Sequence, residues 1–461
     1  MSQQFTPEMP VHASQPHMKR VLSTWHLVAF GLAYINLMGI FILYGLATQM
    51  TQGMMALAFV IATLAMGLTA WSYAAMSRQF VAAGSVYSYV AKTFNPTSAF
   101  AVGWVVMLDY IVLPLLNFLL IGLYLHQLMP SIPQWIFSLL AMAVIVGLAI
   151  KGVSESARLG SITTLLGVVF IAVFAGYLVV AITSDGQGVG SLFNLSGFFT
   201  PEAMSSPEAG FSSVLAACAI LCLMFLGFDG ITTFAEETRD PRNQVGQAII
   251  FTCAIAGVVF IVVAYLMQLA WPEAWQQMQQ PDVASTELIG RVAGPAMNIV
   301  FTAIFVAGCI GSGLSALSAG SRILYSMGRD GVLPRQLGVL HPRFKTPIVA
   351  ILFISAIGVL SLFTGLMEIS SIVNFGALIA FMAVNLCVIV QYRMRLKVKG
   401  PRSVVFFTVL PATGLLVDFL IWINLDSAAQ TIGLLWTALG LIVIGIKTRG
   451  LRRPMGVLSD V

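Results

Sequence analysis

The run GLAYINLMGIFILYG, residues 31–45, crosses a long apolar stretch and interrupts it with Asn36 and three glycines. A second run, FLGFDGITTFAEE at residues 225–237, interrupts another apolar stretch with two glycines around Asp229. Glycine weakens a helix and frees backbone groups, and paired interruptions in corresponding halves of a chain mark binding sites near the centre of a bilayer. One such glycine alone more often serves close helix packing, so the prediction depends on the pair. The two runs predict one site between two broken helices.

The whole chain shares the apolar character of these runs. Of its 461 residues, 58% are hydrophobic and 9% are charged, and the mean hydropathy is +0.92. Soluble domains carry about 25% charged residues, so this composition excludes that class and requires lipid as the solvent. The first twenty residues are polar and lack the apolar core of a signal peptide, so we expect no cleavage there.

Apolar stretches long enough to cross a hydrocarbon layer, which takes roughly 20 helical residues, recur along the chain. They are continuous and do not alternate as barrel strands do, so the sequence predicts an all-α membrane protein. We expect twelve transmembrane helices, at residues 23–49, 54–76, 100–123, 132–150, 160–182, 210–235, 245–271, 297–324, 347–366, 369–391, 404–424 and 428–446.

Lysine and arginine fall almost entirely on one side of these spans. Of the 23 basic residues, only Arg291 lies in a loop on the other side. Basic residues in short loops stay cytoplasmic, so both termini are predicted to be cytoplasmic. The net charge of +5 therefore reflects membrane topology and not nucleic-acid binding. The cytoplasmic loop at 329–346 mixes basic and aliphatic residues, which predicts that it lies at the membrane surface.

The two interrupted spans each open a set of five, and five spans per set force the two sets into opposite orientations. The sequence therefore predicts an inverted repeat with two additional helices. The expected divisions are a cytoplasmic tail at 1–20, a first repeat at 21–183, an external loop at 184–209, a second repeat at 210–392, the last two helices at 393–447 and a cytoplasmic tail at 448–461.

Several motifs carry a family resemblance. They are RQFVAAGSVYSYVAKTFNP and VGWVVMLDYIVLPLLN within 78–117, FLGFDGITTFAEETRDPRN at 225–243, SRILYSMGRDGVLPRQLGVLHPRFKTP at 321–347 and NFGALIAFMAVNL at 374–386. With them the chain resembles the amino acid-polyamine-organocation (APC) transporters over about 22–451, and among these the bacterial putrescine importers. The resemblance implies a LeuT-type fold, alternating access, a bacterial inner (plasma) membrane location and a substrate between helices 1, 3, 6, 8 and 10.

The resemblance also places substrate groups at the two breaks. Amides of the first break, at 35–41, would bind a substrate carboxylate, and carbonyls of the second break, at 225–230, would bind an ammonium. Where putrescine importers carry an acidic residue and a histidine, this chain has Ile42 and Leu317, which keeps neutral amino acids open as substrates. The residues expected to bind substrate are Tyr34, Asn36, Gly39, Asp109, Tyr110, Phe225, Gly227, Phe228 and Asp229, with Phe225 or Phe228 as a gate.

Three carboxylates lie within predicted spans, where a charge costs roughly 2.5 to 3.5 kcal/mol. Asp229 could bind an ammonium, carry a coupling proton or cap the freed amides of its own helix. Asp109 could supply a second anion to the same cavity or serve polar packing. Asp418 lies outside the repeat, and we expect a structural or oligomer-related role.

Coupling and gating residues follow from the same arrangement. Candidates for the coupling ion are Asp229 for a proton and Ser315 and Ser318 for sodium. Ion pairs among Arg78, Glu236, Glu237 and Arg322 are expected at the cytoplasmic gate. The sequence has no nucleotide-binding or metalloprotease motif, and its five cysteines lie in predicted spans without a histidine cluster, so we expect no enzyme activity, no metal and no cofactor.

These features together predict a secondary importer of a small organic amine or amino acid, with a putrescine-like polyamine favoured. Proton symport is favoured over exchange, and sodium coupling stays open. A neutral amino acid transporter or exchanger of the same fold is one alternative. A channel or a transport-inactive nutrient sensor are alternatives from other classes. The expected partners are the substrate, the coupling ion and the lipid bilayer.

Overall fold

The computed structural model describes residues 22–81, 85–152, 156–184, 188–205, 210–329 and 333–448. The tails expected at 1–20 and beyond residue 448 lie outside these ranges, and so does the side chain of Glu236. The α-helices are α1 (Thr24–Ile35), α2 (Tyr44–Met50), α3 (Met55–Gln79), α4 (Ser85–Thr93), α5 (Pro96–Leu128), α6 (Gln134–Lys151), α7 (Ser156–Thr183), α8 (Pro201–Ser205), α9 (Gly210–Leu221), α10 (Pro241–Ala270), α11 (Ala274–Gln277), α12 (Ala284–Arg329), α13 (Ile348–Gly358), α14 (Leu366–Ile389), α15 (Pro401–Val404), α16 (Leu410–Ile423) and α17 (Ser427–Lys447).

Shorter helical pieces join or interrupt these helices. Most are 3₁₀ turns, and two are π-helical. They are η1 (Leu37–Phe41), η2 (Leu195–Gly197), η3 (Cys222–Phe225), η4 (Asp229–Glu237), η5 (Pro281–Val283), η6 (Arg335–Gly338), η7 (Val359–Leu362), η8 (Val390–Arg395) and η9 (Val405–Val409). Among the described residues, the only extended pairing is an isolated bridge between Leu22 and Thr238.

Eleven segments of the described chain are long and apolar enough to cross a membrane. They confirm an all-α, multi-pass membrane protein. The ninth expected span is the exception: its apolar helix covers only Ile348–Leu362, of which the last four residues are the 3₁₀ turn η7. The eighth span is longer than expected and covers Pro281–Arg329, with a non-helical Gly294 at φ 82° before its membrane part.

The first break separates α1 from α2. Asn36 ends α1 in the left-handed region, at φ 53°, and its carbonyl accepts from the Gly39 amide at 2.7 Å. Asparagine tolerates this conformation better than most residues. The break also exposes the Phe41 carbonyl, which accepts a hydrogen bond from the Tyr124 hydroxyl of α5 at 3.0 Å. A neighbouring helix therefore satisfies a backbone group that the break frees.

The second break lies between α9 and η4 and is longer than the expected 225–230. The chain leaves α-helical geometry at Cys222 and forms two 3₁₀ pieces, η3 and η4, with a turn at residues 226–228 between them. Gly227, at φ +122°, makes the sharpest turn, in a region that side chains other than glycine rarely adopt. Asn374 of α14 donates to the carbonyls of Ala219 and Ile220, at 3.0 and 3.2 Å. Here too a neighbouring helix satisfies freed carbonyls.

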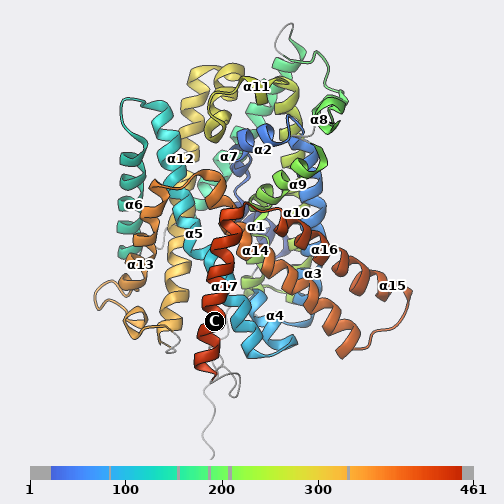
Figure 1. Cartoon of the computed structure of the whole chain (residues 1–461), viewed down its shortest axis with the longest axis vertical. Helices are drawn as coiled ribbons and strands as arrows, with labels where there is room; N and C mark the ends of the chain where they lie inside the picture. Colours follow the sequence, from blue (N-terminus) through green and yellow to red (C-terminus); the bar gives the residue numbers. More distant parts are fainter. Residues whose placement is uncertain are drawn as a thin grey trace, which may run out of the picture.

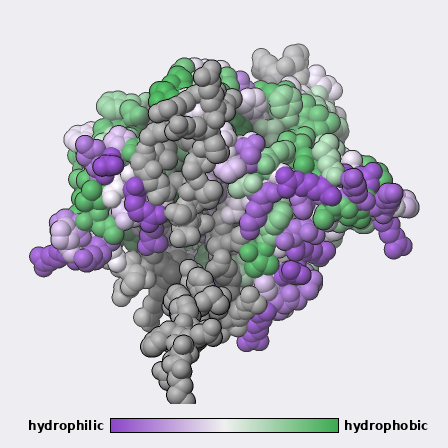
Figure 2. All heavy atoms as spheres, turned by 90° about the horizontal axis from the view of Figure 1, so that it is seen from below, coloured by the Kyte–Doolittle hydropathy of each residue, from purple (hydrophilic) through white to green (hydrophobic). Residues whose placement is uncertain are grey.

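Helices α3 and α10 pack along each other, while α5 packs between α12 and α14. Helix α4 lies at the lower end of the molecule, and α8 and α11 lie at the upper end (Figure 1). This separation agrees with the alternation of loops that the sequence predicts. Seen from below, hydrophilic side chains gather on the rim of the lower end (Figure 2).

A buried polar network joins α3, α14 and α16 around Asp418. The Oδ2 atom of Asp418 accepts from Thr69 Oγ1 and from Asn385 Nδ2, both at 2.9 Å. Ser72 donates its hydroxyl to Asn385 Oδ1 at 2.5 Å. Asp418 is fully buried and does not line the large cavity described below. These contacts favour a structural role for Asp418.

Replacing Asn385 with alanine is expected to lower stability by about 1–3 kcal/mol, because the buried Ser72 hydroxyl loses its acceptor and Asp418 Oδ2 loses one of its two donors. Thermal unfolding of the detergent-purified protein measures the change. Asn424→Ala is the control, since that amide bonds only to Leu420 of its own helix. We expect no change in apparent substrate affinity, and a selective loss of affinity would contradict the structural role.

Candidate functional site

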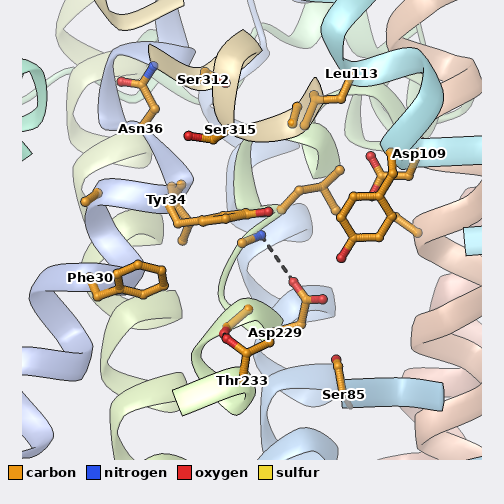
Figure 3. A pocket seen from close by; sticks show the side chains of 18 of the residues that line it. Phe30, Tyr34, Asn36, Ser85, Asp109, Leu113, Asp229, Thr233, Ser312 and Ser315 are labelled. Carbon is orange, nitrogen blue, oxygen red and sulfur yellow. Dashed lines mark hydrogen bonds between the residues drawn. The ribbon is translucent and has the colours of Figure 1, made fainter. Parts of the chain in front are cut away.

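A cavity of about 1150 Å³ lies between the two breaks. Its walls come from α1, α4, α5, α7, α12, α14 and the segment from η3 to η4. Tyr34, Asn36, Asp109, Asp229 and Ser315 line it, and Figure 3 shows these side chains around one space. The structure thus brings residues from both breaks together with α5 and α12.

Other expected site residues divide into two groups. Gly39, Tyr110, Gly227 and Arg322 also line the cavity, whereas Phe225, Phe228, Ser318, Arg78 and Glu237 do not. Phe225 and Phe228 are both fully buried. Phe228 stacks on Phe381 with the ring centroids 5.3 Å apart, so it lies behind a side chain that does face the cavity. Gating by these two rings stays a prediction.

Tyr34 connects the two breaks directly. A methyl group built on Gly227 would lie 2.1 Å from Tyr34 Cδ1, so the Cδ1 edge of the ring lies directly against this glycine. Despite that contact, Tyr34 is 44% exposed, because its other side faces the open cavity (Figure 3). Glycine at 227 therefore allows both the backbone turn and the position of the aromatic ring.

Asp229 lies at the start of η4, where backbone amides converge on its carboxylate. The Gly227 amide donates to Asp229 Oδ1 at 3.3 Å, drawn as a dashed line in Figure 3. The amides at 229 and 230 also interact with the carboxylate. Anions are stabilised by such freed amides at a helix start. Capping of its own broken helix, one of the expected roles of Asp229, is thus present alongside its exposure to the cavity.

Asp109 has a different environment on the α5 wall. Its Oδ1 atom is buried and has no hydrogen-bond partner among the described residues. A carboxylate oxygen without a donor is costly in a site of low polarity. Asp109 therefore has a carboxylate oxygen on the cavity wall that no described residue pairs.

The serines of α12 lie on the far side of Tyr34 from Asp229 (Figure 3). Ser315 lines the cavity, but its hydroxyl donates to the Gly311 carbonyl of its own helix at 2.9 Å. Ser318 lies outside the cavity lining. Sodium binding by these serines stays a prediction.

The cavity extends toward the end of α12 that carries Arg322, and its lining also includes Leu22 and His26. Among the described side chains, Glu237 forms no ion pair with Arg78 or Arg322. The start of the first broken helix and the end of the second are instead joined through the backbone. The Leu22 amide donates to the Glu237 carbonyl, and the Leu22 carbonyl accepts from the Arg239 amide, both at 3.1 Å. The expected ionic gate stays a prediction.

Aromatic rings fill the region on the opposite side of the first break. Phe41 packs on Phe301 with the centroids 5.0 Å apart, and Phe170 packs on Phe301 at 5.4 Å. Tyr124 and Phe305 extend this cluster at 4.4 Å. None of these five residues lines the cavity. The cavity therefore does not extend into the aromatic cluster.

Two residues that support the site were not identified from the sequence. Asn374 and Tyr124 are fully buried and donate to carbonyls freed by the breaks. The apolar run 374–386 holds two asparagines, Asn374 and Asn385. An asparagine in such a run is a signal for this kind of role, since an amide in a span needs partners.

Replacing Asn374 with alanine is expected to reduce transport about tenfold, because two carbonyls at the end of α9 lose their donor and the break can relax. Uptake kinetics in proteoliposomes measure the loss, and Asn374→Gln is expected to restore part of it. Asn424→Ala is the control, because that amide donates to Leu420 within its own helix and lies away from the cavity lining. Equal losses in the two alanine variants would contradict a specific role for Asn374.

Comparison with known proteins identifies a family and several relatives that this chain is similar to. The pattern of the amino acid permease family matches residues 26–447. The low-affinity putrescine importer PlaP of Escherichia coli K12 is 34% identical, and the alignment covers 100% of both chains. The methylthioribose transporter of Bacillus subtilis is 27% identical over 93% of this chain and 94% of its own. The branched-chain amino acid permease BcaP of B. subtilis is 26% identical over 95% of each chain.

The family match covers most of the chain, and it confirms the resemblance drawn from the motifs. It also agrees with the expectation of a transporter and not an enzyme, since the family and these relatives are permeases or transporters. A substrate among the amines or amino acids follows at this level. The chain belongs to the amino acid permease family of the APC transporters, a family of multi-pass membrane proteins.

Proposed function

We propose that the protein is a secondary active importer of a small organic amine, with putrescine-like polyamines favoured, that works by alternating access. The observation that carries this proposal is the pair of carboxylates, Asp109 and Asp229, on the walls of one cavity. Asp109 has a buried oxygen without a protein donor, and an ammonium group would supply the missing positive charge. Tyr34 offers an aromatic face to the same cation.

The proposed topology is a LeuT-type inverted repeat of residues 21–183 and 210–392, followed by two helices at 393–447. Breaks at the start of both repeats support it. Both termini are proposed to face the cytoplasm of a bacterial inner membrane, because nearly all basic residues fall on one side of the spans. The cavity would then be open to the cytoplasm and closed to the outside by the aromatic cluster.

Proton symport is the proposed energy source. A carboxylate on the wall of a membrane cavity can exchange a proton as substrate enters or leaves, and both Asp109 and Asp229 have that position. Sodium, bound through Ser315 and Ser318, is the competing coupling ion.

Neutral amino acid transport is the second candidate. Ile42 lines the cavity. It stands at the position where the putrescine importers that this chain resembles carry an acidic residue. One relative is named a branched-chain amino acid permease, while another is named a putrescine importer. The two candidates differ in whether the substrate needs a carboxylate.

Uptake into proteoliposomes that contain the purified protein tests these proposals. Labelled putrescine, leucine and arginine are each supplied with an inward proton gradient or an inward sodium gradient. We expect saturable putrescine uptake that a protonophore abolishes. Leucine uptake alone would favour the second candidate, linear permeation would indicate a channel, and substrate binding without flux would indicate a sensor. Saturable uptake of no amine or amino acid would contradict the importer.

A further inference from the structure

The loop between α12 and α13 ends in a hairpin, residues 339–346, with an unusual surface. Val339, Leu340 and Phe344 are 56%, 39% and 36% exposed. Residues 333–347 include three basic side chains and no acidic one. Exposed apolar residues interspersed with cations are typical of segments that lie in the lipid–water interface.

Backbone bonds hold this hairpin in one shape. The His341 amide donates to the Thr346 carbonyl, and the Lys345 amide donates to the His341 carbonyl, both at 2.9 Å. The amides of Arg343 and Phe344 lie 3.3 and 3.4 Å from His341 Nδ1. A hairpin ordered in this way binds a partner with less loss of conformational entropy than a flexible loop would.

The hairpin is also fixed to the end of α6. Thr346 donates its hydroxyl to the Ile150 carbonyl at 2.8 Å. The next residue of α6, Lys151, is exposed, which adds a cation to those of the hairpin. No acidic residue stands in either segment to neutralise them.

The surroundings of the hairpin indicate which partner covers it. Its apolar residues continue into an exposed face of α13 formed by Val349, Leu352 and Phe353, which are 45%, 50% and 46% exposed. In a membrane-spanning helix such a face contacts acyl chains. The loop, drawn in orange, projects from the side of the molecule below α13 (Figure 1). The hairpin therefore lies where the acyl region of a lipid meets its headgroup.

We propose that the hairpin and Lys151 form a binding site for an anionic phospholipid. Val339, Leu340 and Phe344 contact the upper acyl chains, while Lys151, Arg343 and Lys345 bind the headgroup phosphate. Guanidinium groups suit this role because they bind phosphate oxygens in pairs. The Arg343 guanidinium already lies 5.6 Å from the centre of the Phe344 ring, so the cation and the apolar anchor are held side by side. The proposal does not depend on the transported substrate.

Native mass spectrometry of the full-length protein, titrated with phosphatidylglycerol or phosphatidylcholine, tests the proposal. The cation variant carries Lys151→Gln, Arg343→Gln and Lys345→Gln. We expect wild-type protein to retain phosphatidylglycerol preferentially, and the cation variant to bind it about a hundredfold more weakly, from roughly fivefold per charge. The control variant, Lys397→Gln, Lys399→Gln and Arg402→Gln, removes the same charge from the exposed segment between η8 and η9 and is expected to bind as wild type.

A second variant, with Val339, Leu340 and Phe344 changed to serine, separates the apolar contacts from the charges. It is expected to weaken binding of phosphatidylglycerol while the thermal unfolding midpoint stays unchanged. Equal binding of the two lipids by wild type, or equal losses in the cation and control variants, would overturn the site. A dimer that the serine variant abolishes, with phosphatidylglycerol binding intact, would assign the surface to a second copy of the chain and also overturn it.

Discussion

Asp109→Asn is expected to reduce putrescine uptake by about ten- to a hundredfold, mainly through a higher KM. The variant keeps the shape of the side chain but removes the charge that the cavity wall presents to an ammonium. Hydrogen bonds to charged groups contribute about 1.5–3 kcal/mol, which corresponds to this range. Asp109 Oδ1 has no protein donor, so no neighbouring group loses a partner in the exchange. Radiolabel uptake in proteoliposomes at several substrate concentrations gives KM and maximal rate.

Asp418→Asn is the matched control for this experiment. It is also a buried carboxylate in a span, but its Oδ2 accepts from Thr69 and Asn385 away from the cavity, and an amide oxygen can accept the same bonds. We expect its uptake to stay near wild type. Asp229→Asn is expected to be as severe as Asp109→Asn, since the new amide group would also face the amides of the second break. Unchanged uptake in both cavity variants would exclude cation recognition by these carboxylates.

The two breaks could be predicted because their cause is local. Asn36 and Gly227 stand in apolar runs, and the structure places both at positive φ. The extent of the second break could not be predicted, since η3 and η4 tighten without a proline or glycine at their outer ends. Tertiary contacts determine how far the second break extends, such as the hydrogen bonds that Asn374 donates.

The direction of side chains near a break could not be predicted from the sequence. In a regular helix the spacing of residues shows which share a face. The chain between Cys222 and Glu237 changes its period, so nothing in the spacing distinguishes Asp229, which lines the cavity, from Phe228, which packs behind Phe381. The roles of Asn374 and Tyr124 depend on contacts between helices far apart in the chain, for which one sequence has no signal of pairing.

Gly227→Ala is expected to reduce uptake to near background and to lower the thermal unfolding midpoint. Two effects act together. The residue has φ +122°, where an L side chain is strained by about 1–3 kcal/mol, and the new methyl group would lie 2.1 Å from Tyr34 Cδ1. Either the break or the ring must move, and both form the wall beside Asp229. Gly176→Ala is the control, because a methyl group there meets no atom within 4 Å.

The double variant Gly227→Ala with Tyr34→Ala separates these two effects. Removing the ring relieves the steric clash but leaves the backbone strain, so we expect the unfolding midpoint to recover only in part. Uptake is expected to stay low, because the aromatic face for the cation is gone. Full recovery of the midpoint would show that the clash with the ring is the whole cause and that the turn at 227 tolerates a side chain. Wild-type uptake in the single variant would mean that this glycine does not shape the site, and the coupling of the two breaks through Tyr34 would then be wrong.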